Sequence, residues 1–254
     1  GEAVARRIRR TAKRTARNII SQYADSSFKP MQMEFVFGQN GISPILLELA
    51  DGTFVYLQGR IDRIDMTADG AVRIIDYKSG GKKFDPTLVY WGLQLQLLLY
   101  MAAAVARIPE SRAAGFFYCR VADPTVKTEI RMKEEVEKQI AKKLALSGIT
   151  LSDVSILRAQ GGAQAGMVTK DGKPNGRYAS SMVTDEGMEH LIAFARNKAT
   201  TLAGDIYAGI IDDSPYERGS LNACQSCDYA PICTFDPERK PRRRLLAKTL
   251  DDLL

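Results

Sequence analysis

Residues 54–78, FVYLQGRIDRIDMTADGAVRIIDYK, decide the fold of this 254-residue chain. Two runs rich in β-branched and apolar residues, 54–66 and 71–78, flank the Asp69-Gly70 pair. An Asp-Gly pair between two such runs is a strong signal for a β-hairpin. The stretch therefore predicts one long strand, a tight turn and a second strand that pairs with the first.

The arms of this hairpin carry charged side chains inside runs that otherwise resemble buried strands. Side chains alternate along a strand, so Asp76 and Lys78 point to one face of the sheet and Tyr77 to the other. The turn would bring Asp62 of the first strand close to Asp76. Two close carboxylates repel unless a cation or a proton lies between them, and Mg²⁺ prefers such oxygen ligands. We therefore predict a divalent-metal site, with Lys78 placed to hold a water and to offset charge on a phosphate.

An exposed hairpin with solvated, paired charges is the alternative interpretation. It suits any single aspartate better, because charged strand residues usually lie at the surface. The set as a whole favours the metal site, since Asp76 and Lys78 interrupt an apolar run and a buried charge needs a partner or a metal.

The rest of the chain predicts a mixed sheet with helices packed on it, of the α/β class with α+β character. Residues 86–107 form a mostly apolar helical pattern that ends before Pro109. Acidic residues after Thr184 open another helix, which Gly209 closes. Residues 159–181 are rich in Gly, Lys, Asn and Ser, which predicts a mobile loop or a loose hairpin. The other expected elements are strands over 31–37, 45–49 and 115–121 and a charged helix over 133–146.

Composition excludes several classes of protein. Hydrophobic residues make up 45% of the chain and charged residues 26%, so a folded core is expected. The longest apolar run, 95–105, is too short and too polar to span a bilayer, so no membrane partner is expected. Arginines near the start occupy the place of the apolar part of a secretory signal. The formal charge of +6 favours polyanionic partners slightly.

Residues 2–23 have the periodicity of an amphipathic helix with a strongly basic face. Both a solvated face and a face that contacts phosphates are open interpretations of that basic surface. The chain begins inside this helix without an initiating methionine, so we expect it to be a piece of a longer protein.

Two polar residues stand out in the apolar helix. Gln96 and Tyr100 are four residues apart and so share a helix face. An amide and a phenol there need polar partners, which a metal site or a DNA backbone would supply. The alternative is a core glutamine with internal partners and a tyrosine whose hydroxyl reaches the surface.

The cysteines indicate a metal site rather than a disulfide framework. Cys224, Cys227 and Cys233 supply three thiolates in one short segment, which suits Zn²⁺ or an iron–sulfur cluster in a reducing cytosol. Cys119 lies in an apolar strand and is interpreted as an inert core thiol. Reduced free thiols are the alternative for the group of three.

Together these motifs resemble the RecB-like nucleases of the PD-(D/E)XK superfamily. The resemblance rests on GRIDRID at 59–65, IDYKSG at 75–80, GLQLQLLLY at 92–100 and the closing pattern C-x-x-C-x5-C-x-F-D at 224–236. Within the superfamily the chain is similar, over nearly its whole length, to the C-terminal nuclease domain of the AddB family, whose members are subunits of bacterial AddAB ATP-dependent helicase–deoxyribonucleases.

This resemblance implies a restriction-endonuclease-like core and a set of site residues. Asp62 and Asp76 would bind Mg²⁺ or Mn²⁺, with the Tyr77 carbonyl as a further ligand. Lys78 would be the catalytic lysine, and Asp65 would be structural. The helical pair described above, Gln96 and Tyr100, would line the site and contact DNA.

The resemblance also implies cofactors, partners and a division of the chain. It implies a [4Fe–4S] cluster on Cys224, Cys227 and Cys233. It also implies a partner subunit of the AddA type, a location in the bacterial cytoplasm and a substrate, which is the single-stranded DNA produced by unwinding. No Walker-type glycine loop occurs, so unwinding must belong to another chain or segment. The expected parts are a basic helix over 1–29, the nuclease core over 30–215 and a cysteine segment with a basic tail over 216–254.

The chain departs from the family pattern at three places. The family's helical histidine has no counterpart, because His190 is the only histidine and lies far downstream. Ile61 replaces the superfamily's proline, as in other RecB-like members. The cluster's first cysteine, which lies upstream of the core in the family, is also missing.

From the motifs and the resemblance, the expected function is a metal-dependent DNA exonuclease in break repair. The alternatives are a catalytically incomplete DNA-binding or docking module and a stand-alone CRISPR-associated exonuclease.

Overall fold

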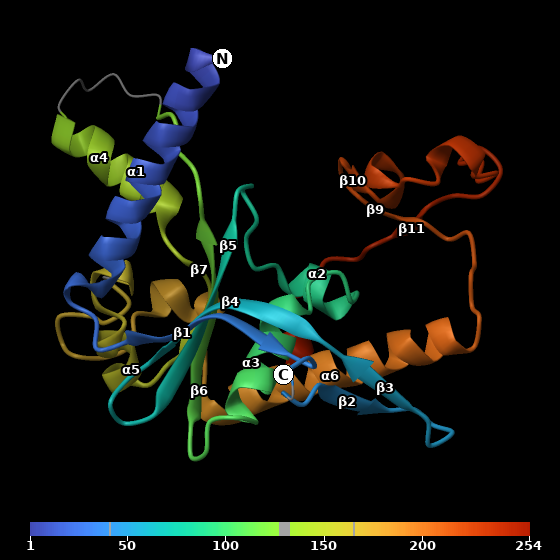
Figure 1. The fold of residues 1–254 in the computed structure, drawn as a ribbon, viewed down its shortest axis with the longest axis horizontal. Helices are drawn as coiled ribbons and strands as arrows, with labels where there is room; N and C mark the ends of the chain where they lie inside the picture. The colour runs from blue at the N-terminus through green and yellow to red at the C-terminus, as the bar shows by residue number, and fades with distance from the viewer. Residues whose placement is uncertain (41, 127–132, 165) are drawn as a thin grey trace.

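A six-stranded mixed sheet forms the centre of the computed structural model, which describes residues 1–40, 42–126, 133–164 and 166–254 (Figure 1). Its strand order is β1-β4-β5-β6-β7-β8. The prediction of a mixed sheet flanked by helices is confirmed. The strands are β1 Lys29–Phe37, β4 Gly59–Met66, β5 Ala71–Lys78, β6 Arg112–Arg120, β7 Ser147–Leu151 and β8 Met182–Val183.

The predicted hairpin is formed by β4 and β5. The two strands are antiparallel, and the Thr67 amide donates to the Ala71 carbonyl at 2.9 Å across the turn. Gly70 has a φ of 85°, a left-handed conformation that glycine adopts at little cost. Beyond the hairpin, β5 runs parallel to β6, β6 antiparallel to β7 and β7 parallel to β8.

The prediction of one long strand over 54–66 is wrong. The chain forms β3 Phe54–Leu57 and then β4, with Gln58 between them. β3 pairs with β2 Ile45–Glu48 in a separate two-stranded sheet, while β4 pairs with β1. The physical reason is the pairing: the two strands lie in different sheets and bond different partners, so they cannot continue as one strand.

The prediction of one continuous helix over 86–107 is also wrong. Two helices replace it, α2 Pro86–Tyr90 and α3 Gln96–Val105. Gly92 has a φ of 82°, which is incompatible with a continuing right-handed helix. Gln94 fixes the preceding loop, because its side chain accepts from the Asp85 amide and donates to the Lys83 carbonyl, each at 2.8 Å. The break makes Gln96 the first residue of a new helix.

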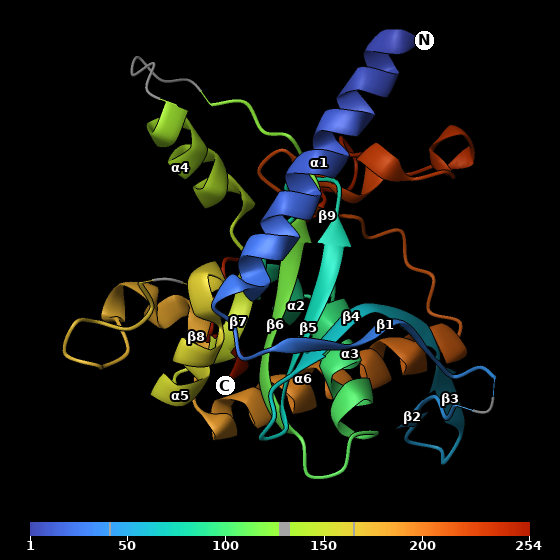
Figure 2. The same cartoon turned by 60° about the vertical axis from the view of Figure 1, so that its left-hand side comes forward.

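Helices cover both faces of the sheet (Figures 1 and 2). On one face α3 and α6 Asp185–Tyr207 enclose the main apolar core. Figure 2 shows α1 Glu2–Ala24 crossing the other face, with α4 Lys133–Leu144 beside it. The Asn18 side chain donates to the Leu144 carbonyl at 3.3 Å and so joins α1 to α4. The core includes Ile64, Ile74, Leu98, Phe116, Ile149 and Leu191, all at most 2% exposed.

The predicted ends of α6 are confirmed. The Thr184 hydroxyl accepts from the Gly187 amide at 3.1 Å, and Gly209 has a φ of 70° just past the last turn. Such a capped start and a left-handed glycine after the end are common helix boundaries. None of the helices that the structure describes is long and apolar enough to cross a membrane.

The segment between α5 Val154–Ala159 and β8 contains two short 3₁₀ helices, Gly161–Gln164 and Gly176–Ser181. An isolated antiparallel bridge joins Val168 to Pro174, in agreement with the expected loose hairpin. The C-terminal part forms a small sheet of β9 Tyr216–Arg218, β10 Leu221–Asn222 and β11 Arg243–Arg244. The other 3₁₀ helices are Ala223–Ser226, Ala230–Ile232 and Asp251–Leu253.

Candidate active site

The hairpin places two carboxylates side by side. Arg63 of β4 is aligned with Ile75 of β5, so the next positions, Asp62 and Asp76, face each other on adjacent strands. The Tyr77 amide donates to Asp62 Oδ2 at 2.8 Å. This hydrogen bond fixes the first carboxylate beside the backbone of the strand that carries the second, as the hairpin pattern predicts.

Asp76 occupies an environment that opposes its charge. Its side chain is 2% exposed, and Lys78 Nζ lies 2.6 Å from Oδ2 in an ion pair. Among the described residues this ammonium is the one polar partner of the oxygen. Burial raises the pKa of Asp76, and the Asp62 carboxylate raises it further, while the Lys78 ammonium opposes both effects. A buried carboxylate beside a second carboxylate is an arrangement that a cation would stabilise.

A chain of polar side chains continues from Lys78 to α3. Lys78 Nζ donates to Gln96 Oε1 at 3.1 Å, and Gln96 Nε2 donates to the Tyr100 hydroxyl at 2.9 Å. The Tyr100 ring packs edge-on against Phe37 at 6.0 Å between centroids. The structure thus brings Lys78, Gln96 and Tyr100 together, and their polar atoms have the partners that the sequence requires.

Asp65 lies on the opposite face of the hairpin, in a buried ion cluster that we define as Arg63, Asp65 and Arg73. All three side chains are fully buried. Arg63 Nη2 and Arg73 Nε donate to Asp65 Oδ2 at 3.0 and 2.8 Å. The Tyr23 hydroxyl of α1 donates to the other carboxylate oxygen at 3.2 Å. Asp65 is therefore a partner of arginines and points away from Asp62 and Asp76.

Amide side chains supply one further acceptor to each arginine of the buried ion cluster. Gln22 Oε1 accepts from Arg63 Nη2 at 3.2 Å, and Gln160 Oε1 accepts from Arg73 Nη1 at 2.8 Å. These residues come from α1 and from the end of α5. The cluster consequently ties the hairpin to two distant parts of the chain.

Tyr77 connects the two faces of the hairpin. Its hydroxyl accepts from Arg63 Nη1 at 2.8 Å in the buried ion cluster, and its amide holds Asp62 on the other side. Burial raises the pKa of the Tyr77 phenol, while the Arg63 guanidinium lowers it. A displacement of this residue would therefore move the carboxylate that it holds.

The donor set fits a hard divalent cation with few protein ligands. Among the described residues there is no group of three or more His, Cys, Asp or Glu side chains that could hold a metal. Mg²⁺ usually keeps several waters and takes one or two carboxylates, so the pair of Asp62 and Asp76 is sufficient. The buried Asp76 carboxylate, placed next to Asp62, is the observation that fits this interpretation best.

The cysteines fall into two unrelated places. Cys119 is fully buried in β6, where burial raises its thiol pKa, in agreement with a core thiol. Cys224, Cys227 and Cys233 lie in the partly and fully exposed segment around two 3₁₀ helices. Their ligand role stays a prediction.

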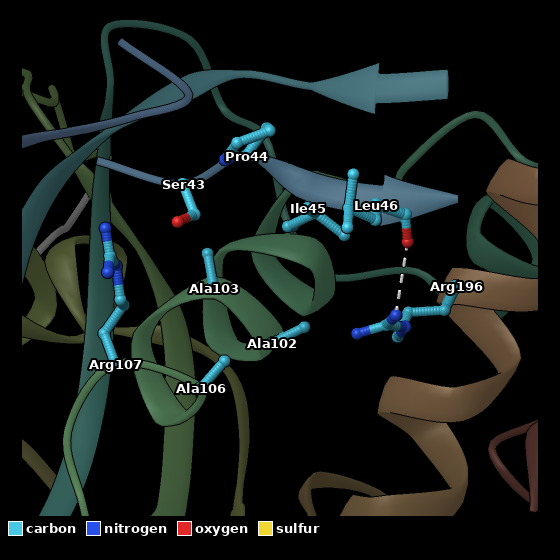
Figure 3. A pocket seen from close by; sticks show the side chains of 9 residues that line it. All are labelled: Ser43, Pro44, Ile45, Leu46, Ala102, Ala103, Ala106, Arg107 and Arg196. Atoms are coloured by element: carbon cyan, nitrogen blue, oxygen red, sulfur yellow. Dashed lines mark hydrogen bonds between the residues drawn. The ribbon is translucent and has the colours of Figure 1, made fainter. Parts of the chain in front are cut away.

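A cavity of about 330 Å³ lies between β2 and α3, away from these residues (Figure 3). Its lining includes Arg107 and Arg196 and no carboxylate, so it offers no metal ligand of the predicted kind. A smaller pocket of about 230 Å³ includes Tyr118 and several lysines next to the carboxylate pair. Sequence reasoning missed this second pocket, because it depends on the parallel pairing of β5 with β6.

Comparison with known proteins agrees with the resemblance seen in the motifs. A subunit of the ATP-dependent helicase/deoxyribonuclease of Alkaliphilus metalliredigens is 36% identical over 248 residues, 91% of this chain and 21% of that protein. The subunits of the same name from Alkaliphilus oremlandii and Acetivibrio thermocellus are each 34% identical, over 91% and 98% of this chain and 21% and 23% of their own lengths. The chain thus spans about a fifth of the length of these relatives.

A family model described as "PD-(D/E)XK nuclease superfamily" matches residues 2–234. That range includes the hairpin with its carboxylates and the helix that carries Gln96 and Tyr100. The chain belongs to the PD-(D/E)XK nuclease superfamily.

Proposed function

We propose that this chain is the metal-dependent deoxyribonuclease part of an AddAB-type helicase–nuclease, acting as an exonuclease in the repair of double-strand breaks. One observation carries the proposal: Asp62, Asp76 and Lys78 meet at one end of the β4–β5 hairpin. Superfamily membership and the names of the relatives support the same class of activity.

In this proposal Asp62 and Asp76 hold Mg²⁺ or Mn²⁺, with the Tyr77 carbonyl as a further ligand. A bound ion of this kind activates a water and neutralises charge on a phosphate. The Tyr77 amide orients the Asp62 carboxylate, and its partners in the buried ion cluster hold that amide in place. Preorganised ligands of this kind reduce the cost of assembling the site when substrate arrives.

Lys78 supplies the positive charge that the reaction needs beside the carboxylates. Its ammonium lies between Asp76 and Gln96. Asp76 balances its charge, and the hydrogen bond to Gln96 orients the side chain. It holds the attacking water and offsets charge that develops on the phosphate. Gln96 and Tyr100 position Lys78 and contact the DNA strand.

Further partners follow from the same proposal. Single-stranded DNA from an AddA-type subunit would be the substrate, in the bacterial cytoplasm. Cys224, Cys227 and Cys233 would bind a [4Fe–4S] cluster whose fourth cysteine lies elsewhere in a longer protein. The basic helix over 1–29, the core over 30–215 and the segment over 216–254 would be the functional parts.

The test is cleavage of single-stranded DNA labelled at either end, with Mg²⁺ or Mn²⁺ and with a chelator. Asp62→Ala and Asp76→Ala should each lose at least about a hundredfold in rate, since each removes a metal ligand. Asp171→Ala, an exposed aspartate in the 166–181 segment, is the matched control and should keep the parent rate. Absence of metal-dependent cleavage, even in the assembled helicase–nuclease, would replace this proposal with a DNA-binding or docking module.

A further inference from the structure

The row of side chains that starts with the two carboxylates continues across the sheet. Asp76 of β5 is aligned with Tyr118 of β6, and Tyr118 is aligned with Ser147 of β7. Tyr118 is 1% exposed, and its hydroxyl has no hydrogen-bond partner among the residues that the structure describes. A buried hydroxyl without a partner is energetically unfavourable, so this atom needs an acceptor that the described chain does not supply.

Tyr118 forms one wall of a pocket of about 230 Å³, which we call the basic pocket. Within the described ranges none of the cationic side chains lining it has an acidic partner within 4.0 Å. Arg120 Nε is a second buried donor without a hydrogen-bond partner there. The lining consists of Gly81, Lys82, Lys83, Tyr118, Arg120, Lys142, Lys143, Ala145 and Ser147.

The basic pocket borders the carboxylate pair directly. Lys78 Nζ and Lys82 Nζ lie 5.9 and 5.1 Å from the centroid of the same Tyr118 ring. Burial lowers the pKa of Lys82. The nearby Lys78 ammonium lowers it further, and the Asp76 carboxylate raises it, so both charges lie close to Lys82. One aromatic ring therefore neighbours both the ammonium beside the carboxylates and the ammonium of the pocket.

The chemistry of the lining selects an anion with several acceptor oxygens. A phosphodiester offers charged oxygens to an ammonium, a guanidinium and a phenol at once, and charge-assisted hydrogen bonds of this kind are strong. Lysine, arginine and hydroxyl side chains are the usual donors to phosphate oxygens of nucleic-acid backbones.

We propose that the basic pocket binds a backbone phosphate adjacent to the one at the carboxylate pair, on the same DNA strand, with Lys82, Tyr118 and Arg120 as donors. This inference rests on the proposed nuclease function and specifies how the substrate lies in that site. The contacts reach only the backbone, so binding here is independent of base sequence.

The test is fluorescence-anisotropy binding of labelled single-stranded DNA in the presence of a chelator, where no cleavage interferes. Lys82→Ala and Arg120→Ala should each weaken binding about tenfold and reduce the slope of log K against log salt by about 0.7, the value expected for one phosphate contact on a single strand. Lys82→Arg, which keeps the charge, should restore most of the affinity. Tyr118→Phe should weaken binding about threefold without changing the slope, because it removes a neutral donor.

Arg107→Ala is the matched control, because Arg107 follows the end of α3 opposite to Gln96 and should not change binding. The melting temperature of each variant checks that it is folded. Parent-like affinity and slope in both Lys82→Ala and Arg120→Ala would overturn the proposal. Failure of the nuclease function is distinguishable, since it would abolish metal-dependent cleavage in the parent while these binding differences persisted.

Discussion

Asp76 is buried next to a second carboxylate, and Lys78 compensates its charge only in part. We therefore predict that Asp76→Asn stabilises the metal-free protein near neutral pH, by about 1 kcal/mol or 2–4 °C in melting temperature. The parent should gain stability as Mg²⁺ or Mn²⁺ is added, because a ligand that binds only the folded state shifts the unfolding equilibrium. Thermal unfolding with and without metal measures both effects.

In the same experiment Asp205→Asn, a change at an exposed position of α6, should leave both melting temperature and metal response unchanged. An equal rise in melting temperature with metal in Asp76→Asn and in the parent would show that the ion binds elsewhere.

Asp65 has a structural role, because it neutralises Arg63 and Arg73, whose side chains are fully buried. We predict that Asp65→Ala costs about 3–5 kcal/mol of unfolding free energy, the range for breaking a buried ion pair from one side. Urea denaturation measures the loss. Asp171→Ala, at an exposed position, should change stability by less than about 0.5 kcal/mol. A loss below about 1 kcal/mol in Asp65→Ala would mean that water or a rearranged side chain replaces the carboxylate.

At the scale of elements, the start of α5 provides a pH-dependent contact. Asp153 Oδ1 accepts from the Ser155 amide at 2.8 Å, and Oδ2 accepts from Arg112 Nη2 at 2.9 Å. Hydrogen bonds from Ser155, and then the Arg112 guanidinium, lower the pKa of Asp153 to about 2. The folded pKa lies below the unfolded value, so the ionised form stabilises the protein above about pH 4, and this contribution disappears as the pH falls toward 2.

Asp153→Ala should accordingly lose about 1 kcal/mol of unfolding free energy at neutral pH, the usual cost of removing a helix cap. The difference from the parent should shrink between pH 4 and pH 2 in chemical denaturation. Asp153→Asn keeps a capping oxygen but no charge, and its smaller loss should fade over the same interval, because only the parent gains from ionisation. A difference between parent and alanine variant that is constant with pH would contradict the assigned role of the charge.

Local signals in the sequence predicted the elements that depend on neighbours in the chain. The Asp69-Gly70 turn and the Thr184 cap define the hairpin and α6, because turn and cap preferences act over a few residues. The break at Gly92 was not predicted, since glycine is tolerated within a helical pattern. Its positive φ and the close approach of Leu202, 2.9 Å from where a Cβ would lie, are visible only in the folded chain. In the same way, the separation of β3 from β4 depends on which strand each one pairs with.

Two short strands with distant partners, β7 and β8, were not predicted from the sequence. β7 was absent from the sequence expectations, and it pairs with β6 so closely that a side-chain carbon at Gly148 would lie 1.8 Å from the Phe116 carbonyl oxygen. Asp62, Asp76 and Lys78 could be predicted because one hairpin carries all three. Tyr118 could not, since its place beside Asp76 requires the pairing of two strands separated by two helices.

At the scale of the whole molecule, the end of the chain returns to the core. Leu245, Leu250 and Leu253 are at most 8% exposed, and the Trp91 indole donates to the Leu246 carbonyl at 3.1 Å. We predict that removal of residues 245–254 costs about 4 kcal/mol or more, since burying one leucine side chain contributes about 1.5–3 kcal/mol. Thermal unfolding of the shortened protein measures the loss.

The matched control is Leu246→Ala, because this side chain is 67% exposed and the substitution keeps the carbonyl that accepts from the Trp91 indole. It should leave the melting temperature within about 2 °C of the parent. A shortened protein that melts with the parent would show that the tail is not part of the cooperative unit.

The hairpin of β4 and β5 carries the carboxylate pair on one side and the buried ion cluster on the other, within residues 59–78. A protein engineer who grafted this segment onto a new scaffold would have to transfer Gln22, Tyr23 and Gln160 as well, because they complete the arginine contacts. Without these residues the grafted segment would bury two guanidinium groups that lack part of their hydrogen-bond partners. The carboxylate pair and its ion cluster therefore need three separate pieces of chain, and the Lys78 contact with Gln96 needs a fourth from α3.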